Sequence, residues 1–331
     1  MAVPDWVVAP LVRAVRANAS IAASSATAAL RREVFPLRCS VHVGEDFTHL
    51  MTGLRRIHGA LRAFELSPGD RLGHAVALGV QPRWWCERSP TVLVAREERM
   101  FDLLWELLLY RSGAVTARPG RAVVAEHELT LHAQAMFGGD RQFSQIARLA
   151  SELHDARALA CAGFPDGSRR SPGDDGLLRA FLDLPGVFKR GREPVAVDVR
   201  AEVETLRDLQ QHVRRELSGR DLVVEINPSS NLLIGDLREL ERHPLWGLRP
   251  PRGVSDVPIA VCVGSDDPLT FDTTLPREYQ IIFDALRLAG VSADEGVDWL
   301  DHARRVGLDA RFSVPRSDRV SPLALQSIAA L

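Results

Sequence analysis

The stretch PIAVCVGSDDP, at residues 258–268, joins an apolar run to an abrupt polar break. A near-continuous apolar run of this length predicts a strand buried on both faces, as in a parallel sheet covered by helices. Two adjacent carboxylates follow the run, at Asp266 and Asp267. Like charges beside a buried strand are costly unless a cation neutralises them, and the N-cap of the next helix needs one aspartate, not two. The stretch therefore predicts the end of a parallel strand that lies close to a cation.

Three further segments have the same design, a short β-prone run that ends in polar residues. They are LRCSVHV at 37–43, RLGHAV at 71–76 and LVVEI at 222–226. Gly44 and Glu45 break the first run just after His42, and His74 lies near the end of the second. Helical patterns come before, between and after these strands, at about 6–32, 47–66, 201–217, 276–288 and 293–306.

This alternation predicts an α/β fold of parallel β/α units, as in the (β/α)8 TIM barrel, with the active site at the C-terminal ends of the strands. Four units are recognisable, which is half of the eight that close a barrel. The chain from His74 to Glu225 is far longer than the roughly 30 residues of one β/α unit. A mostly helical insert therefore interrupts the barrel segments. The predicted division is a barrel segment at 1–79, the insert at 80–195 and a second barrel segment at 196–331.

The insert contains a strongly apolar helix at about 101–110, which has two interpretations. It is either an assembly surface, through which the chain forms a homo-oligomer, or the core of a small helical insert. A second helix is predicted at 142–162, and the polar, glycine-rich segment at 166–176 predicts a loop.

Composition narrows the class of protein. The formal net charge is -2, from 41 basic and 43 acidic residues. This balance excludes a positive electrostatic potential over the whole protein that would attract nucleic acid or an anionic membrane. The four cysteines are far apart and form no C-x-x-C pair, which argues against a disulfide framework or a thiolate zinc site. No stretch is apolar for the length of a membrane span, and the first residues do not have the pattern of a secretion signal. We expect a cytoplasmic protein that does not bind membranes.

Five ordered motifs together resemble the adenosine and AMP deaminase family of metal-dependent hydrolases. In chain order they are His-x-Gly-Glu, Leu-Gly-His, Asn-Pro-Ser-Ser-Asn, His-Pro and Ser-Asp-Asp-Pro, with Glu278 and Tyr279 eleven and twelve residues after Asp267. The corresponding family strings are similar to His-Ala-Gly-Glu, Gly-His-Gly, Cys-Pro-x-Ser-Asn, His-Pro and Thr-Asp-Asp-Pro. The agreement covers residues 37–79 and 221–290. It implies that 1–79 holds the fifth and sixth units of a TIM barrel and 196–331 the seventh and eighth.

The resemblance implies hydrolytic deamination of adenosine or a related purine through metal-bound hydroxide. His42 and Asp266 match metal ligands, usually for one zinc ion. Glu45 matches the acid that protonates the purine ring next to the reacting carbon, so it would need a raised pKa. His74 matches the histidine that orients and stabilises the hydroxide.

The remaining matches concern the substrate. Asp267 matches the carboxylate that hydrogen-bonds the purine and positions the attacking group. Glu45 and Gly44 are expected beside the same purine nucleoside or nucleotide. Ser229, Ser230 and Asn231 match a turn of the family to which we assign structural support.

Two features of the family are missing from the sequence. There is no His-x-His pair, which would supply two more ligands, and no glycine-bearing strand that contacts the purine. We therefore expect a separate N-terminal half-barrel polypeptide or domain to complete the site. The large insert resembles those of bacterial antiviral adenosine deaminases. Two alternatives stay open: a non-catalytic assembly or regulatory subunit with a degenerate deaminase fold, and a hydrolase acting on AMP, a modified adenine or another exocyclic amine.

Overall fold

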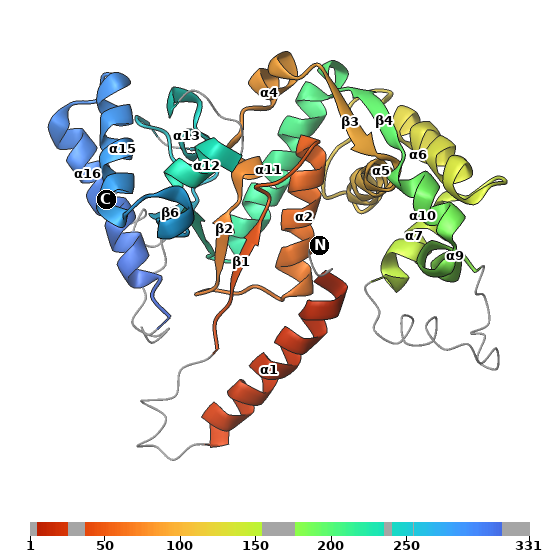
Figure 1. The fold of residues 1–331 in the computed structure, drawn as a ribbon, viewed down its shortest axis with the longest axis horizontal. Coiled ribbons are helices and arrows are strands. Elements are labelled where there is room, and N and C mark those ends of the chain that lie inside the picture. The colour runs from red at the N-terminus through yellow and green to blue at the C-terminus, as the bar shows by residue number, and fades with distance from the viewer. Residues whose placement is uncertain (1–4, 26–36, 154–175, 235–239, 254, 313–331) are drawn as a thin grey trace.

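The centre of the protein is a four-stranded parallel sheet. The computed structural model describes residues 5–25, 37–153, 176–234, 240–253 and 255–312. The strand order across the sheet is β1-β2-β5-β6, which is also their order along the chain (Figure 1). All neighbouring pairs are parallel. The strands are β1 (Ser40–Val43), β2 (Arg71–His74), β5 (Val223–Ile226) and β6 (Ala260–Val263).

The register of the sheet brings the C-terminal ends of the strands to one edge. Val43 is opposite His74, Gly73 is opposite Glu225, and Ile226 is opposite Val263. The predicted strands therefore exist and run in one direction, and the sheet is consistent with part of an α/β barrel. Among the described residues, β1 and β6 are the two outer strands.

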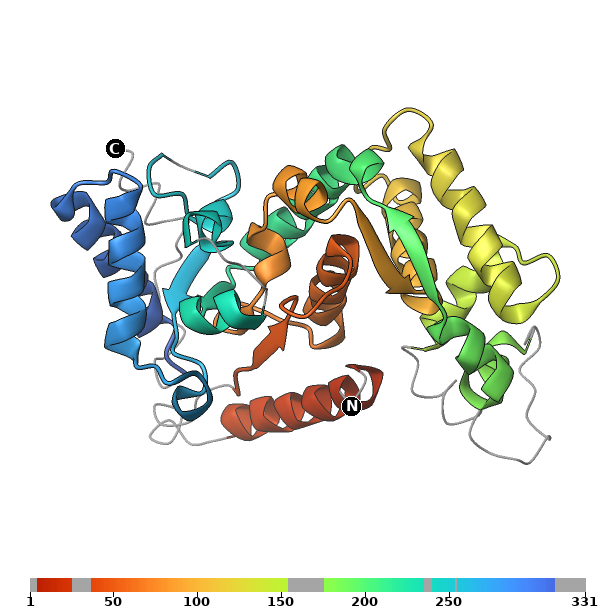
Figure 2. The ribbon, with the colours of Figure 1, turned by 45° about the horizontal axis from the view of Figure 1, so that its top comes forward.

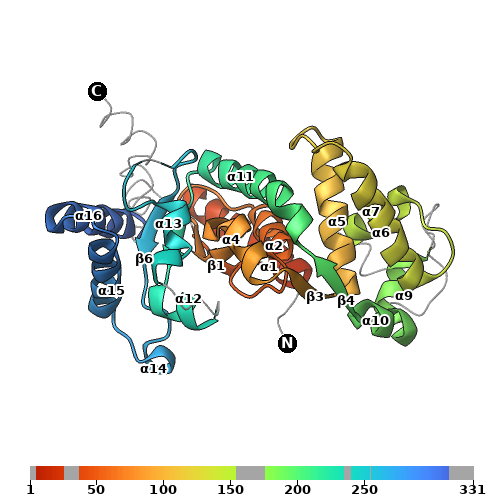
Figure 3. The same cartoon turned by 90° about the horizontal axis from the view of Figure 1, so that it is seen from above.

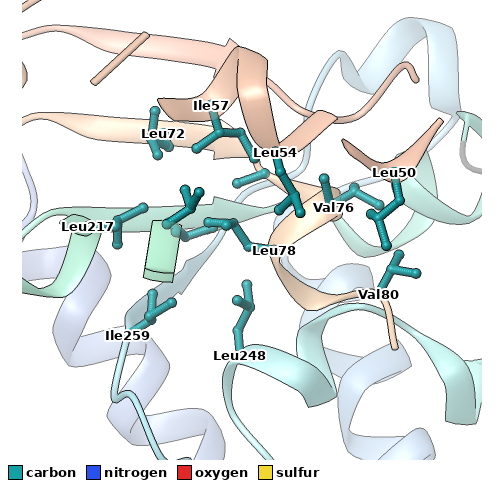
Figure 4. Packing of buried hydrophobic residues seen from close by; sticks show 14 of the residues in the cluster. Leu50, Leu54, Ile57, Leu72, Val76, Leu78, Val80, Leu217, Leu248 and Ile259 are labelled. Carbon is teal, nitrogen blue, oxygen red and sulfur yellow. The ribbon is translucent and has the colours of Figure 1, made fainter. Parts of the chain in front are cut away.

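Helices cover the sheet and contribute most of the core. Helix α2 begins at Leu50 because its N-cap, His49, accepts a hydrogen bond from the backbone N–H of Met51 at 3.1 Å. Its buried face carries Leu54 and Ile57, which meet Leu72 of β2 (Figure 4). Figure 2 shows α2, α11 and the short helices near the sheet, with α15 and α16 beyond β6. The helices of this part are α1 (Asp5–Ser25), α2 (Leu50–Ala63), α3 (Val76–Gly79), α4 (Pro82–Arg88), α11 (Val203–Gly219), α12 (Pro228–Ile234), α13 (Leu245–Leu248), α14 (Pro268–Phe271), α15 (Leu275–Leu288) and α16 (Ala293–Asp309), with 3-10 turns at η2 (Arg200–Glu202) and η3 (Leu240–Arg242).

Helices α3 and α13 approach each other so closely that two glycines are required. A Cβ on Gly79 would lie 1.9 Å from the carbonyl oxygen of Pro244, and a Cβ on Gly247 would lie 2.0 Å from the carbonyl oxygen of Gly79. Both obstacles are backbone atoms, which cannot move aside as a flexible side chain can. The contact fixes the loop after β2 against the segment that leads to β6.

We expect Gly79→Ala to lower the free energy of unfolding by about 1–3 kcal/mol, the usual cost of overpacking. Gly59→Ala is the matched control, because a Cβ at Gly59 in the middle of α2 meets no atom within 4 Å. That substitution should stabilise the protein by about 0.5–1 kcal/mol, since alanine is the better helix former. Urea denaturation of the two variants measures both effects. Equal stabilities of the two variants would contradict the close approach.

The part of the chain from β3 to β4, within the stretch between β2 and β5, forms a second body at the far end of the molecule from β6 (Figure 3). It begins and ends in an antiparallel ribbon of β3 (Thr91–Ala95) and β4 (Pro194–Asp198), which the sequence patterns did not predict. The backbone N–H of Val199 donates to the carbonyl of Pro90 at 3.1 Å, so the two ends of the segment meet. The ribbon leads into α5 (Arg96–Arg111), α6 (Arg121–Phe137), α7 (Phe143–Glu152), α9 (Leu177–Asp183) and α10 (Pro185–Arg192).

The apolar helix predicted at 101–110 lies within α5 and packs both inside this second body and, through Trp105 and Leu109, against the main core. Met100, Leu103 and Leu107 of α5 are buried with Leu129 of α6 in one cluster. The face for which the sequence offered two interpretations therefore contributes to a core within the chain. The predicted loop at 166–176 and the end of the predicted helix at 142–162 lie outside the described residues, Gly176 excepted. In the part of the chain that the structure describes, no helix has both the length and the apolar character needed to cross a membrane.

Candidate metal centre

Three predicted site residues meet at the C-terminal edge of the sheet. One potential ligand atom from each of His42, Glu45 and His74 lies within 4.8 Å of the other two. His42 is on β1, and Glu45 follows the turn at Gly44, whose φ of +77° suits glycine. His74 is the last residue of β2. Parallel pairing of β1 with β2 thus brings together side chains that are about thirty positions apart in the sequence.

The rings of His42 and His74 pack edge to face, and a glycine makes room for them. Their centroids are 4.8 Å apart with an interplanar angle of 79°. A Cβ on Gly73 would lie 2.3 Å from Cδ2 of His42, so a larger residue at that position would displace the His42 ring. His42 is exposed, whereas His74 is buried. The cluster therefore has one open side and one side held within the protein.

Strained backbone marks the same edge. His74 and Ala75 have φ values of +63° and +45°, and Asp266 after β6 has a φ of +57°. Residues other than glycine rarely adopt this left-handed conformation, and each instance costs of order 1–3 kcal/mol unless the surroundings enforce it. Such strain concentrates at functional sites, where it aims a side chain in a required direction.

Asp266 joins the cluster from the far side of the sheet. Its Oδ2 is 3.7 Å from Nε2 of His74, and its Oδ1 accepts from the backbone N–H of Asp267 at 2.9 Å. The carboxylate is largely covered, with 18% of the side chain exposed. Three of the predicted site residues, His42, Glu45 and Asp266, therefore surround the imidazole of a fourth, His74. Imidazole nitrogens and carboxylate oxygens are the donors that zinc takes in proteins, so the residues present fit a divalent metal.

Asp267 has a different environment from Asp266. It is exposed and caps α14, accepting hydrogen bonds from the backbone N–H of Leu269 at 3.0 Å and from the hydroxyl of Thr270 at 2.5 Å. The Thr270 hydroxyl, with the backbone N–H groups, holds the pKa of the Asp267 carboxyl below its ordinary value. Of the two adjacent aspartates, one is thus the helix cap and the other faces the cluster. The substrate contact predicted for Asp267 stays a prediction.

Gly44 has a structural role that is visible in the backbone. Its carbonyl accepts from the N–H of Ala77 at 2.9 Å, which links the turn after β1 to α3. A Cβ at this position would also lie 2.4 Å from Cδ1 of Ile57. The substrate contact predicted for Gly44 likewise stays a prediction.

Two residues that touch His74 were not predicted from the sequence as site residues. Nδ2 of Asn231 is 2.8 Å from Nδ1 of His74, and Nδ2 of Asn227 is 3.4 Å from its Nε2. Both asparagines are buried and belong to the Asn-Pro-Ser-Ser-Asn motif, which follows β5. The motif that contains both asparagines was therefore visible in the sequence, but a purely structural turn accounted for the motif equally well.

The same motif also anchors α15. The backbone N–H of Ser229 donates to Oε2 of Glu278 at 2.9 Å, and the hydroxyls of Ser229 and Thr273 both contact Oε1 of that buried carboxylate. Glu278 is the glutamate eleven residues after Asp267. It fixes the start of α12 relative to α15.

His243, in the His-Pro motif, is a buried structural residue. Its Nδ1 accepts from the backbone N–H of Leu245 at 3.0 Å, and burial lowers its pKa to about 4. In the unfolded chain histidine takes up its proton near pH 6.5. Between pH 6.5 and 4 the unfolded state thus binds a proton that the folded state excludes. The contribution to stability is complete above pH 6.5 and is lost as the pH falls toward 4.

We expect the free energy of unfolding to decrease across this window, with His243 contributing at most about 1.4 kcal/mol per pH unit. His243→Asn keeps an acceptor for the Leu245 N–H and should make the pH dependence shallower. His58, whose pKa burial also lowers to about 4, maintains the remaining slope in that variant. Urea midpoints measured from pH 7 to pH 4 test this. An unchanged slope in His243→Asn would show that His243 is not buried in its neutral form.

Comparison with known proteins gives partial matches to deaminases. The chain is 35% identical over 98 residues to an aminodeoxyfutalosine deaminase of Acidothermus cellulolyticus, covering 27% of this chain and 25% of that protein. It is 35% identical over 110 residues to an adenine deaminase of Rhizobium johnstonii, covering 33% and 30%. A match to an adenine deaminase of Agrobacterium fabrum is 38% identical over 63 residues, covering 19% and 18%.

No protein-family model matches the chain. The matches span less than a third of the length of each of these relatives. Each relative is named as a deaminase. The likeness supports a relationship between this chain and hydrolytic deaminases of the amidohydrolase type.

Proposed function

We propose that this chain carries part of the active site of a metal-dependent hydrolase that removes the exocyclic amine of adenosine or a related purine. The observation that carries the proposal is the cluster of His42, Glu45 and His74, which parallel strands assemble at their C-terminal ends. The partial likeness to adenine and aminodeoxyfutalosine deaminases supports the same reaction class and adds free adenine to the candidate substrates. A purine-type amine is therefore the substrate class to test.

Each residue has a proposed role in the reaction. His42 and Asp266 would hold the metal ion, for which we propose zinc. Zinc, when bound, lowers the pKa of a coordinated water toward neutrality and so supplies a nucleophile. Glu45 would donate a proton to the ring nitrogen beside the reacting carbon, which makes that carbon electrophilic. His74 would orient the attacking water. The amine then leaves as ammonia, and a carbonyl oxygen takes its place.

Asp267 and Gly44 are proposed to contact the purine. The exposed carboxylate of Asp267 would accept a hydrogen bond from the base once substrate is present, at the cost of its contacts to α14. Gly44 lies directly before Glu45, so its backbone would contact the purine beside that carboxyl.

The proposed site needs further metal ligands and further strands from outside this chain segment. Two of its proposed residues are metal ligands, whereas a catalytic zinc has three protein ligands in most enzymes. Backbone groups on the outer sides of β1 and β6 have no strand partner among the described residues, and such edges tend to pair with further strands. We propose that an N-terminal half-barrel polypeptide or domain supplies both the missing ligands and the missing strands.

Co-expression with the polypeptide encoded immediately upstream tests the proposal. Bound zinc is measured by mass spectrometry, and ammonia release is measured with adenine, adenosine and AMP as substrates. We expect about one zinc per complex and ammonia from at least one of the three purines. A folded complex with neither zinc nor ammonia release would favour the alternative of a non-catalytic assembly or regulatory subunit.

A further inference from the structure

The buried amide of Asn231 contacts one ring nitrogen of His74 and decides where that ring carries its proton. We propose that Asn231, together with Asn227, is a positioning residue that holds His74 in the tautomer with the proton on Nε2. The catalytic meaning of this tautomer rests on the proposed function. The tautomer itself depends on the fold alone and can be observed without activity.

The orientation of the Asn231 amide follows from its second partner. The backbone N–H of Asn227 donates to Oδ1 of Asn231 at 3.2 Å, and both residues are buried. A backbone N–H can donate but cannot accept, so the oxygen of the amide has to face it. The NH2 group of Asn231 therefore faces His74, with Nδ2 at 2.8 Å from Nδ1. An obligate backbone donor thus fixes which end of the amide the histidine meets.

Nδ1 of His74 can accept the hydrogen bond from the Asn231 amide only if Nδ1 carries a lone pair and no proton. A neutral imidazole carries one proton, so a lone pair on Nδ1 places the proton on Nε2. Glu45 would compete for the opposite arrangement, because its Oε2 is 3.0 Å from the same Nδ1. The Glu45 contact, however, does not have the geometry of a hydrogen bond, whereas the Asn231 contact does. Asn231 therefore determines that Nδ1 of His74 carries no proton.

Asn227 completes the arrangement at the other ring nitrogen. Its Nδ2 lies 3.4 Å from Nε2 of His74, and its buried Oδ1 finds no partner in the described part of the chain. With the proton on Nε2, a half-turn of this amide would let Oδ1 accept from the ring N–H. Without the half-turn, the NH2 group of Asn227 would face the Nε2–H of His74, and Oδ1 of Asn227 would stay buried without a partner. Each of these arrangements costs free energy, and the half-turn removes both. The two asparagines then hold the ring at both nitrogens.

The tautomer determines what His74 offers to the site. Nε2 is the nitrogen that faces Asp266, with Oδ2 at 3.7 Å, and it presents an N–H donor there. In this state His74 can donate a hydrogen bond to an oxygen atom at the edge of the sheet. It has no free lone pair on that side with which to take a proton.

Nitrogen NMR of the chain labelled with ¹⁵N-histidine tests the inference directly. Spectra are recorded at pH 8 without added metal, and the signals of His74 are identified by their loss in His74→Gln. We expect Nδ1 of His74 to have the shift of an unprotonated nitrogen and Nε2 that of a protonated one. In Asn231→Asp, a carboxylate keeps the acceptor for the Asn227 N–H but replaces the donor at Nδ1 with an acceptor. The tautomer should then invert, with the proton on Nδ1.

Two further variants separate Asn231 from its neighbours. Ser230→Ala changes a buried residue of the same turn that does not touch His74 in the described contacts, and it should leave the tautomer unchanged. Glu45→Gln removes the competing charge, and it should also leave the tautomer unchanged. If Asn231→Asp does not fold, Asn231→Ala serves in its place and should give a mixture of tautomers.

A protonated Nδ1 in the wild-type chain, or inversion in Glu45→Gln but not in Asn231→Asp, would overturn the inference. A chain with the expected tautomer but no deaminase activity in its complex would contradict the proposed function alone. The two hypotheses can therefore fail separately.

Discussion

Replacing Glu45 by glutamine in the completed enzyme should reduce ammonia release by about 10²- to 10⁴-fold, the usual contribution of a positioned acid or base. Glutamine has the same shape as glutamate but has no carboxyl proton to donate to the purine ring. The proposed ligands His42 and Asp266 are unchanged in this variant, so the zinc content should stay the same. Steady-state rates and metal analysis on the same preparation measure the two effects together.

Glu65→Gln is the matched control for this variant. Glu65 is exposed and pairs with Arg13 at 3.8 Å, and it lies in the turn that leads from α2 to the N-terminal end of β2. We expect its activity to remain at the wild-type level. Equal activity of Glu45→Gln and Glu65→Gln would exclude Glu45 as the proton donor, whereas loss of zinc in Glu45→Gln would assign Glu45 to the metal.

The second large effect is expected at Arg99, where Arg99→Leu should lower the free energy of unfolding by about 3–5 kcal/mol. Arg99 on α5 is 1% exposed and donates to two carboxylates. Its Nε is 2.9 Å from Oε1 of Glu128, and its Nη2 is 2.6 Å from Oε1 of Glu202. The leucine variant would leave these carboxylates without their shared cation. Of the two, Glu202 is itself buried and also contacts Nε2 of His49 at 3.1 Å.

Arg118→Leu is the control for the loss of an ion pair at the surface. Arg118 donates to Asp208 at 2.6 Å, but its side chain is 47% exposed, and exposed pairs contribute about 0–1 kcal/mol. Urea denaturation of both variants gives the comparison. A loss at Arg99 no greater than that at Arg118 would show that the buried network relaxes or admits water.

The sequence was sufficient to locate the parallel strands because each combines an apolar run with a polar break. The runs predicted at 37–43, 71–76, 222–226 and 258–263 contain β1, β2, β5 and β6, each of which is one to three residues shorter. The same breaks indicated the site, since the polar residues that end parallel strands meet at one edge. His42, Glu45, His74 and Asp266 are therefore brought together as their positions predicted.

Other features depend on contacts between distant parts of the chain and could not be predicted in this way. β3 and β4 each have five residues, and their pairing joins segments about a hundred residues apart. The contact between Asn231 and His74 joins residues 157 positions apart, and a turn-forming motif gives no indication of it. The different roles of Asp266 and Asp267 depend on a left-handed backbone at Asp266 that two identical letters cannot reveal.

The hydrogen bond between Val199 and Pro90 has a consequence for how such a chain could evolve. An insertion whose two ends lie side by side adds little loop-closure entropy to its host, however long it is. The host can therefore gain, lose or exchange this segment as a unit without altering the register of the sheet. Polar contacts with the host limit this freedom: Arg99 and Arg121 pair with Glu202 before α11, and Asp102 of α5 pairs with Arg55 of α2. An ancestral exchange of the segment would have required compensating changes at these host residues.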